Sequence, residues 1–157
     1  VKVVDITELE AKEQRMQEKE MVEQVSIKFE LNEEQDRAYR IAAEHVTHRG
    51  SSPLKMYIVR LGGTGKTRVL EAIADLLDRR GESRRLLIAA PTGTAAALLC
   101  GSTYHYILGL RDDDDYISGN LLAQIKERLQ GVDFIFFDEV SMLSCYDLYR
   151  ICERLAL

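Results

Sequence analysis

The sequence predicts an α/β fold in which a parallel β-sheet carries helices on both faces. Three short apolar runs, residues 56–59, 86–90 and 132–137, have the composition of buried strands. The runs at 56–59 and 86–90 each lead into a glycine-containing loop and then into residues at helical spacing. Continuous apolar strands that alternate with helices are typical of a parallel sheet covered on both sides.

Composition limits the class of protein. The chain has 157 residues, 46% hydrophobic and 30% charged, which suits one folded domain of ordinary size. No stretch approaches the roughly 18 uninterrupted apolar residues of a membrane span, so we expect a soluble intracellular protein without a membrane partner. The cysteines Cys100, Cys145 and Cys152 lack the paired spacing of a zinc site and are interpreted as reduced and structural. A net charge of −5 means that any contact with nucleic acid must be local.

The pattern of charged residues and helix caps predicts that the chain has two regions. Residues 1–28 are predicted to form a charged helical leader, and residues 29–157 the main domain. Asn32, with Gln35 three positions later, predicts a capping box that opens a helix reaching about Val46. Further helices are expected after the glycine-rich loop up to Gly81, at 95–99, and at 121–129. The aspartates at 112–115 are interpreted as a solvated loop, because adjacent carboxylates cannot all face one metal ion.

The main functional candidate is a glycine-rich turn leading into a helix, Gly62-Gly63-Thr64-Gly65-Lys66-Thr67. Such a turn lets several backbone N–H groups converge on a polyphosphate. Lys66 would lie against the outer phosphates, and Thr67 would offer its hydroxyl to Mg²⁺. The complete P-loop pattern has glycine where this chain has Arg60, which accepts a left-handed backbone less readily. The motif predicts a site for ATP and Mg²⁺; the alternative is an ordinary glycine turn before a helix.

Asp138 and Glu139 stand at the end of the most hydrophobic predicted strand. Carboxylates at the tip of a buried parallel strand are expected beside the P-loop. There Asp138 would hold Mg²⁺ through its waters, and Glu139 would orient the attacking water. The catalytic candidates are therefore Lys66, Asp138 and Glu139, with Thr67 and Asp138 on the metal. The alternative is a polar pair that merely marks a strand end.

Three further segments carry a family resemblance: Leu31-Asn32-Glu33-Glu34-Gln35, Ala90-Pro91-Thr92-Gly93-Thr94-Ala95-Ala96 and Asp138-Glu139-Val140-Ser141-Met142. In this order, over about residues 29–143, the chain resembles superfamily 1 DNA helicases of the petite-integration-frequency (PIF) family, including those of Helitron transposons. The resemblance implies the first RecA-like domain of a two-domain motor. It also implies ATP-driven 5′-to-3′ unwinding with single-stranded DNA as partner, and a nuclear or mitochondrial role in DNA repair, recombination and telomere maintenance.

The resemblance also assigns roles to individual residues. It implies that Gln35 reads the adenine edge, although the residues alone equally suit a simple capping role. It implies single-strand contacts by Pro91, Thr92 and Gly93, and by Thr103 and His105. From the residues alone, the first group is a loop between strand and helix, and a lone histidine is more often structural.

The resemblance places the second motor domain, with its arginine finger, beyond these 157 residues. The isolated chain is therefore expected to bind ATP and Mg²⁺ but to hydrolyse ATP slowly and not to unwind duplex. The sequence also allows two other interpretations of the function. One is a kinase or ATPase that does not use DNA, and the other is a non-catalytic transposon-derived remnant, favoured by Arg60 and the abrupt end of the chain.

Overall fold

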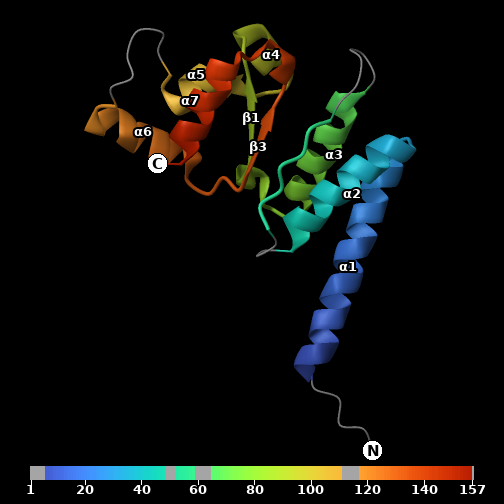
Figure 1. Ribbon diagram of the computed structural model, residues 1–157. Helices are drawn as coiled ribbons and strands as arrows, with labels where there is room; N and C mark the ends of the chain where they lie inside the picture. Colours follow the sequence, from blue (N-terminus) through green and yellow to red (C-terminus); the bar gives the residue numbers. More distant parts are fainter. Residues whose placement is uncertain (1–5, 49–51, 59–64, 111–116, 157) are drawn as a thin grey trace, which may run out of the picture. The chain divides into compact units, whose positions relative to one another are not determined.

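The computed structural model describes residues 6–48, 52–58, 65–110 and 117–156, and it divides into two compact units, Val1–Ser83 and Arg84–Leu157 (Figure 1). The described helices of the first unit are α1 (Ile6–Lys28), α2 (Glu33–Thr47) and α3 (Lys66–Arg79). The second unit holds a sheet with helices, and the 3-10 turn η1 (Ser83–Arg85) connects the two along the chain. No described helix is long and apolar enough to cross a membrane.

The first unit is built on the packing of α2 against α3. Both helices bury a stripe of apolar side chains at helical spacing, which confirms the amphipathic pattern read from the sequence. The buried residues are Tyr39, Ala42, Ala43 and Val46 on α2, and Val69, Leu70, Ala72, Ile73, Leu76 and Leu77 on α3. Gly81, with φ of 68°, follows the end of α3 as predicted.

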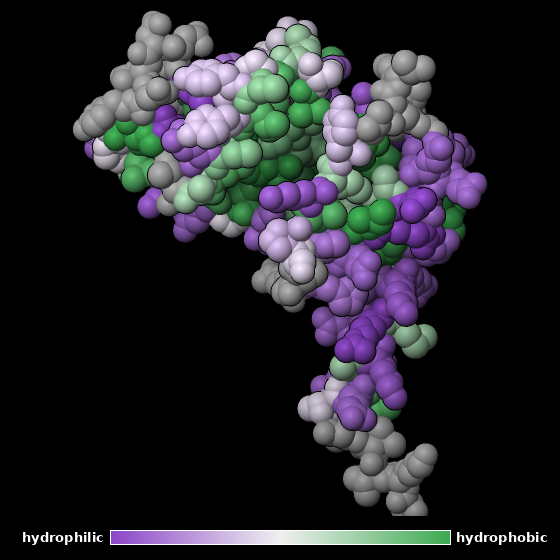
Figure 2. Space-filling view, in the orientation of Figure 1, coloured by the Kyte–Doolittle hydropathy of each residue, from purple (hydrophilic) through white to green (hydrophobic). Residues whose placement is uncertain are grey.

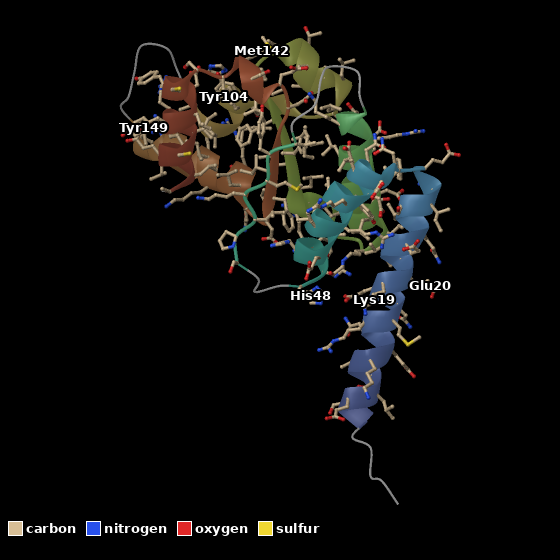
Figure 3. The ribbon with its side chains drawn as sticks, turned by 45° about the vertical axis from the view of Figure 1, so that its right-hand side comes forward. Lys19, Glu20, His48, Tyr104, Met142 and Tyr149 are labelled. Atoms are coloured by element: carbon tan, nitrogen blue, oxygen red, sulfur yellow. The ribbon has the colours of Figure 1, made fainter. Side chains whose placement is uncertain are left out.

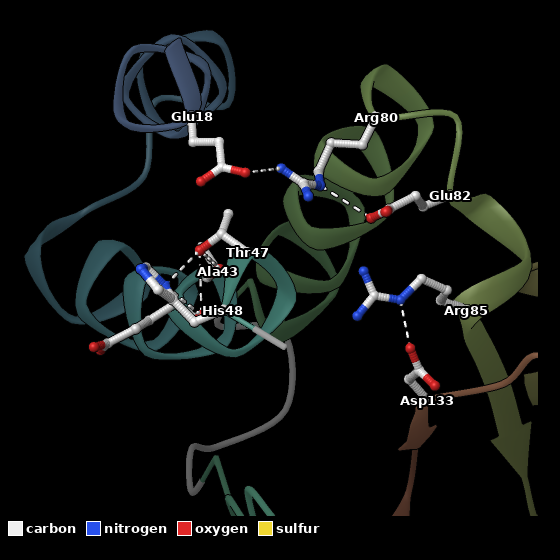
Figure 4. A network of polar contacts seen from close by, with 9 residues as sticks. Glu18, Ala43, Thr47, His48, Arg80, Glu82, Arg85 and Asp133 are labelled. Atoms are coloured by element: carbon white, nitrogen blue, oxygen red, sulfur yellow. Dashed lines mark hydrogen bonds and ion pairs between the residues drawn. The ribbon is translucent and has the colours of Figure 1, made fainter. Parts of the chain in front are cut away.

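The leader is a helix, as predicted, and its last turns join the first unit through polar contacts. Lys28 Nζ lies 2.6 Å from Asp75 Oδ1, and Arg80 Nη1 donates to Glu18 Oε1 at 3.1 Å (Figure 4). Val25 and Ser26 are buried, whereas Met16, nearer the start of the helix, is 71% exposed. Figure 2 shows the correspondingly polar surface of α1. The predicted boundary at residue 28 stays a prediction; the contacts place α1 in the same unit as α2 and α3.

The strand predicted before the P-loop is wrong over its described part. Residues 52–58 have no regular secondary structure, and Met56 and Tyr57 are 37% and 65% exposed. An apolar, partly β-branched run becomes a strand only when a neighbouring strand satisfies its backbone N–H and C=O groups. No described strand pairs with residues 56–58, so their β propensity is not enough to make them a strand. Val59 lies outside the described residues.

The second unit confirms the parallel sheet and the α/β class. Its strands are β1 (Leu86–Ala90), β2 (Ser102–Thr103) and β3 (Phe134–Phe137), in the order β2-β1-β3 with both pairings parallel. The connecting elements are α4 (Gly93–Leu98), α5 (Tyr104–Leu108) and α6 (Gly119–Leu129). After β3 come η2 (Val140–Met142) and α7 (Cys145–Leu155). The loop at 112–115 lies outside the described residues.

One face of this sheet packs on helices. Leu87, Ala89, Ile135 and Phe137 belong to the same apolar cluster as residues of α5 and α7, namely Tyr104, Ile107, Leu108 and Ile151. Figure 3 shows the position of Tyr104, which is 4% exposed, while Met142 and Tyr149 lie at the surface. The cysteines, expected to be structural, are all exposed and contribute nothing to this core. At the start of β1, Arg85 pairs with Asp133 at 2.5 Å (Figure 4).

The polar contacts of α1 make the stability of the first unit depend on pH. Burial acts to raise the pKa of Asp75, but hydrogen bonds from Lys28 and Arg79 outweigh it and hold this pKa below its ordinary value. A carboxyl with a lowered pKa stabilises the fold above its unfolded-state pKa, and the stabilisation is lost as pH falls through the folded-state pKa. We expect Asp75→Asn to cost about 1 kcal/mol at pH 7.

At pH 2.5 to 3, the gap between Asp75→Asn and the wild type should narrow or close. The measurement is thermal unfolding followed by circular dichroism. Glu71→Gln, an exposed change on the same helix, is the control and should match the wild type at both pH values. An Asp75→Asn penalty that stays constant from pH 7 to pH 3 would contradict this assignment.

Candidate functional site

The described part of the P-loop is its last glycine and the helix that follows. Gly65 is the N-cap of α3, with φ of 85° and ψ of 27°, a left-handed conformation that glycine adopts without strain. Lys66, half-buried, and Thr67, exposed, are the first two residues of α3. Gly62, Gly63, Thr64 and the departure at Arg60 lie outside the described residues. The structure thus confirms the helix start, and the roles of Lys66 and Thr67 stay predictions.

The start of α3 suits an anion. The N-cap residue of this helix, Gly65, has no side chain to cap it, whereas Asn32 caps α2 and Ser118 caps α6 through side-chain oxygens. The first N–H groups of an α-helix have no partner within the helix, and they carry the positive end of its dipole. A phosphate group fits such an end, and Lys66 adds a full positive charge. The residues present therefore fit the polyphosphate that the motif predicts.

Gln35 makes the predicted capping box and one contact that sequence reasoning missed. Its Oε1 accepts from the Asn32 backbone N–H at 3.0 Å, and its own N–H donates to Asn32 Oδ1 at 3.0 Å. Its Nε2 also donates to the carbonyl oxygen of Gly65 at 3.1 Å. The capping role is confirmed, and the reading of adenine stays a prediction. No local pattern could reveal the contact with Gly65, which lies 30 residues away.

In the second unit, the remaining predicted residues follow the ends of parallel strands. Pro91, Thr92 and Gly93 follow β1, Thr103 ends β2, and Asp138 with Glu139 follows β3. The register pairs Ala89 with Phe137 and Ala90 with Thr103, and the Asp138 N–H donates to the Ala89 carbonyl at 2.9 Å. Carboxyl ends of adjacent parallel strands share one edge of the sheet. This edge therefore brings together the acidic pair and the predicted DNA-contacting residues.

Glu139 has a backbone conformation that is unusual for its residue type. Its φ of 49° and ψ of 37° place it in the left-handed region, where it is the N-cap of η2. For a residue other than glycine, asparagine or aspartate this conformation costs free energy, and it persists where the surroundings enforce it, often at functional sites. Asp138 is half-buried and Glu139 exposed, so water reaches the outer carboxylate.

Thr92 and Thr103 begin helices. The Thr92 hydroxyl accepts from the Ala95 N–H at 3.2 Å, and the Thr103 hydroxyl accepts from the Tyr106 N–H at 3.3 Å. Accepting a capping bond uses a lone pair of the hydroxyl and leaves its proton able to donate to a phosphate oxygen. Capping and the predicted DNA contact are therefore compatible at both positions.

His105 has a structural contact of its own. Its ring stacks on Tyr104, with 4.0 Å between centroids and 28° between planes. It also lies near Asp147, whose pKa is lowered first by the Ser144 hydroxyl and to a smaller extent by the charge on His105. These contacts support the structural interpretation of His105, and its contact with DNA stays a prediction.

A basic side chain of α6 contacts α5 and was not anticipated. The Arg128 guanidinium lies 4.2 Å from the centre of the Tyr106 ring, and Arg128 Nη1 donates to the Tyr106 carbonyl oxygen. Tyr106 is 60% exposed and follows Thr103 and His105 on α5. The pair joins α5 to α6 across 22 residues, so no spacing in the sequence indicated it. It supplies local positive charge in a chain whose net charge is −5.

Comparison with known proteins identifies the family. Residues 40–156, most of the chain, match the family described as AAA domain. The chain belongs to this family. The P-loop assignment and the α/β class agree with that membership.

Named relatives agree with the resemblance drawn from the motifs. The chain is 33% identical over 118 residues to ATP-dependent DNA helicase PIF1 of Trypanosoma brucei brucei, covering 74% of this chain and 11% of the relative. It is 31% identical over 120 residues to PIF4 of the same organism, covering 72% and 13%. It is 27% identical over 124 residues to uncharacterized protein 030L of Invertebrate iridescent virus 6, covering 74% and 22%. The chain spans less than a quarter of these relatives, and no solved structure matches.

The geometry at Gly65 predicts that this position tolerates no side chain. A Cβ there would lie 2.3 Å from Gln35 Nε2, and the left-handed backbone costs an L-residue about 1–2 kcal/mol. We expect Gly65→Ala to lower the free energy of unfolding by at least about 1 kcal/mol and to abolish nucleotide binding. Gly119→Ala, at the open first position of α6, should change neither. Thermal unfolding and ATP titration test this, and a Gly65→Ala chain that binds ATP normally would contradict it.

Proposed function

We infer that this chain is the ATP-binding portion of a DNA helicase of the PIF family. The observation that carries this conclusion is the start of α3, where a left-handed glycine leads directly into Lys66 and Thr67 at the N-terminus of the helix. Family membership and similarity to proteins named ATP-dependent DNA helicases support it. The proposal for the whole protein is 5′-to-3′ unwinding in DNA repair, recombination or telomere maintenance, in the nucleus or the mitochondrion.

The proposal gives each residue of the two motifs one role. Lys66 neutralises the outer phosphates, and the first N–H groups of α3 bind their oxygens. Thr67 and Asp138 hold Mg²⁺, which supplies charge stabilisation to the phosphates when bound. Glu139 orients the water that attacks the γ-phosphate. Mg²⁺ keeps several waters in its coordination shell and needs only one or two carboxylates from the protein, and Asp138 would supply one.

The proposed DNA contact uses the sheet edge of the second unit. The hydroxyls of Thr92 and Thr103 keep a proton that a phosphate oxygen can accept, and Arg128 adds positive charge beside Tyr106 of α5. Contacts of this kind are made to the sugar-phosphate backbone of DNA and do not distinguish one base sequence from another. This suits a motor that moves along DNA.

A nucleotide titration with two variants tests the ATP site. Lys66→Ala removes the charge on the outer phosphates and should weaken binding of Mg·ATP at least tenfold, corresponding to about 1.4 kcal/mol. Asp138→Asn should weaken binding of Mg·ATP but leave binding of ATP in EDTA unchanged, because its role is on the metal. Calorimetry measures both. Equal affinity of wild type and Lys66→Ala would favour a non-catalytic remnant and reject the proposal.

A matched pair of substitutions tests the DNA contact. Asparagine and aspartate both cap helices well, so Thr92→Asn and Thr92→Asp should each keep α4 intact. The aspartate places a negative charge against the DNA backbone and should weaken binding of a single-stranded oligonucleotide about three- to tenfold relative to asparagine at low salt. Fluorescence anisotropy measures this. Identical affinities for the two variants would place DNA elsewhere.

A further inference from the structure

The amide of Gln35 joins two segments that are distant in the sequence. Its Oε1 accepts from the Asn32 N–H, which holds the side chain against the start of α2. Its Nε2 donates to the Gly65 carbonyl at the start of α3, at 3.1 Å. The amide group is thus oriented from α2 and presented to the last glycine of the P-loop.

The Gly65 carbonyl belongs to the same peptide group as the Lys66 N–H. A trans peptide is planar, so its C=O and N–H point in opposite directions, and fixing one fixes the other. The carbonyl accepts from Gln35 Nε2 and also from the Arg68 N–H at 3.2 Å. Together these bonds determine where the Lys66 N–H points, and this N–H is among the donors that a helix N-terminus offers to phosphate.

We propose that Gln35 is a positioning residue for the triphosphate: it orients the Gly65–Lys66 peptide, so that it contributes to phosphate binding whatever the base. This rests on the proposed ATP site at Lys66. It differs from a role in reading adenine, which would contribute only when the base is adenine. Gly65 adopts its left-handed conformation without strain, which lets its carbonyl accept from Gln35 Nε2.

The contact is not needed to hold the two helices together. α2 and α3 are joined by their buried apolar stripes, including Tyr39, Val46 and Leu70, whereas Gln35 is only partly buried. A variant that lacks the Nε2 donor should therefore keep the fold of the first unit. This makes the effect on nucleotide binding separable from an effect on stability.

The test compares three ligands on the 157-residue chain: Mg·ATP, Mg·GTP and inorganic tripolyphosphate with Mg²⁺. Gln35→Met lacks the donor and is similar in size. Gln35→Glu keeps the acceptor for the Asn32 N–H and also lacks the donor. Both variants should weaken the binding of all three ligands by a similar factor of about three to ten, which corresponds to the loss of one hydrogen bond. Asn32→Ala loses half of the capping box but keeps the contact with Gly65; its affinities should stay within about twofold of wild type.

Two outcomes would overturn the proposal. One is a loss confined to ATP in Gln35→Met, with GTP and tripolyphosphate unaffected, which would assign Gln35 to the base. The other is unchanged affinity for all three ligands. The NMR chemical shift of the Lys66 backbone amide is a second test, because it should change in Gln35→Met and not in Asn32→Ala. A wild-type chain that binds none of the ligands would instead reject the proposed ATP site itself, and this inference with it.

Discussion

The backbone of Gly65 is the constraint on which the N-terminal end of α3 depends. Its left-handed conformation turns the chain into the helix, and its carbonyl accepts both the first helical hydrogen bond and the amide of Gln35. The helix is held in turn by an apolar stripe that packs on α2. The packed helix pair thus fixes the position of the N-terminus of α3 and of Lys66, its first residue. This is preorganisation, because the donors do not have to be assembled when the ligand arrives.

A second constraint operates in the other unit. Parallel pairing of β1 with β2 and β3 places the carboxyl ends of the strands at one edge of the sheet. Residues that are separate in sequence, Thr92, Thr103 and Asp138, lie at or just after these ends and so share that edge. The apolar cluster beneath, where Ala89 and Phe137 pack with α5 and α7, keeps the strands in register. The side chains of loops on such a scaffold can differ without disturbing the core.

The two units offer different chemical groups, and this difference gives the family resemblance a physical basis. The first unit supplies positive charge and helix N–H groups, which suit phosphates. The second supplies carboxylates, which suit a metal ion and a water, and capped helix starts, which suit a nucleic-acid backbone. The proposed nucleotide-driven motor needs each of these chemistries, and residues 40–156, which match the AAA domain family, include parts of both units.

Local features were determined by the sequence itself. The capping box of α2, the ends of α2 and α3, and the strands at 86–90 and 134–137 follow from caps, periodicity and apolar runs, which act over a few residues. The tertiary structure alone decided that 56–58 is not a strand, that Gln35 meets Gly65, and that Arg128 lies on Tyr106. A strand requires a partner, and contacts across 20 to 30 residues depend on how elements pack, which no local pattern encodes.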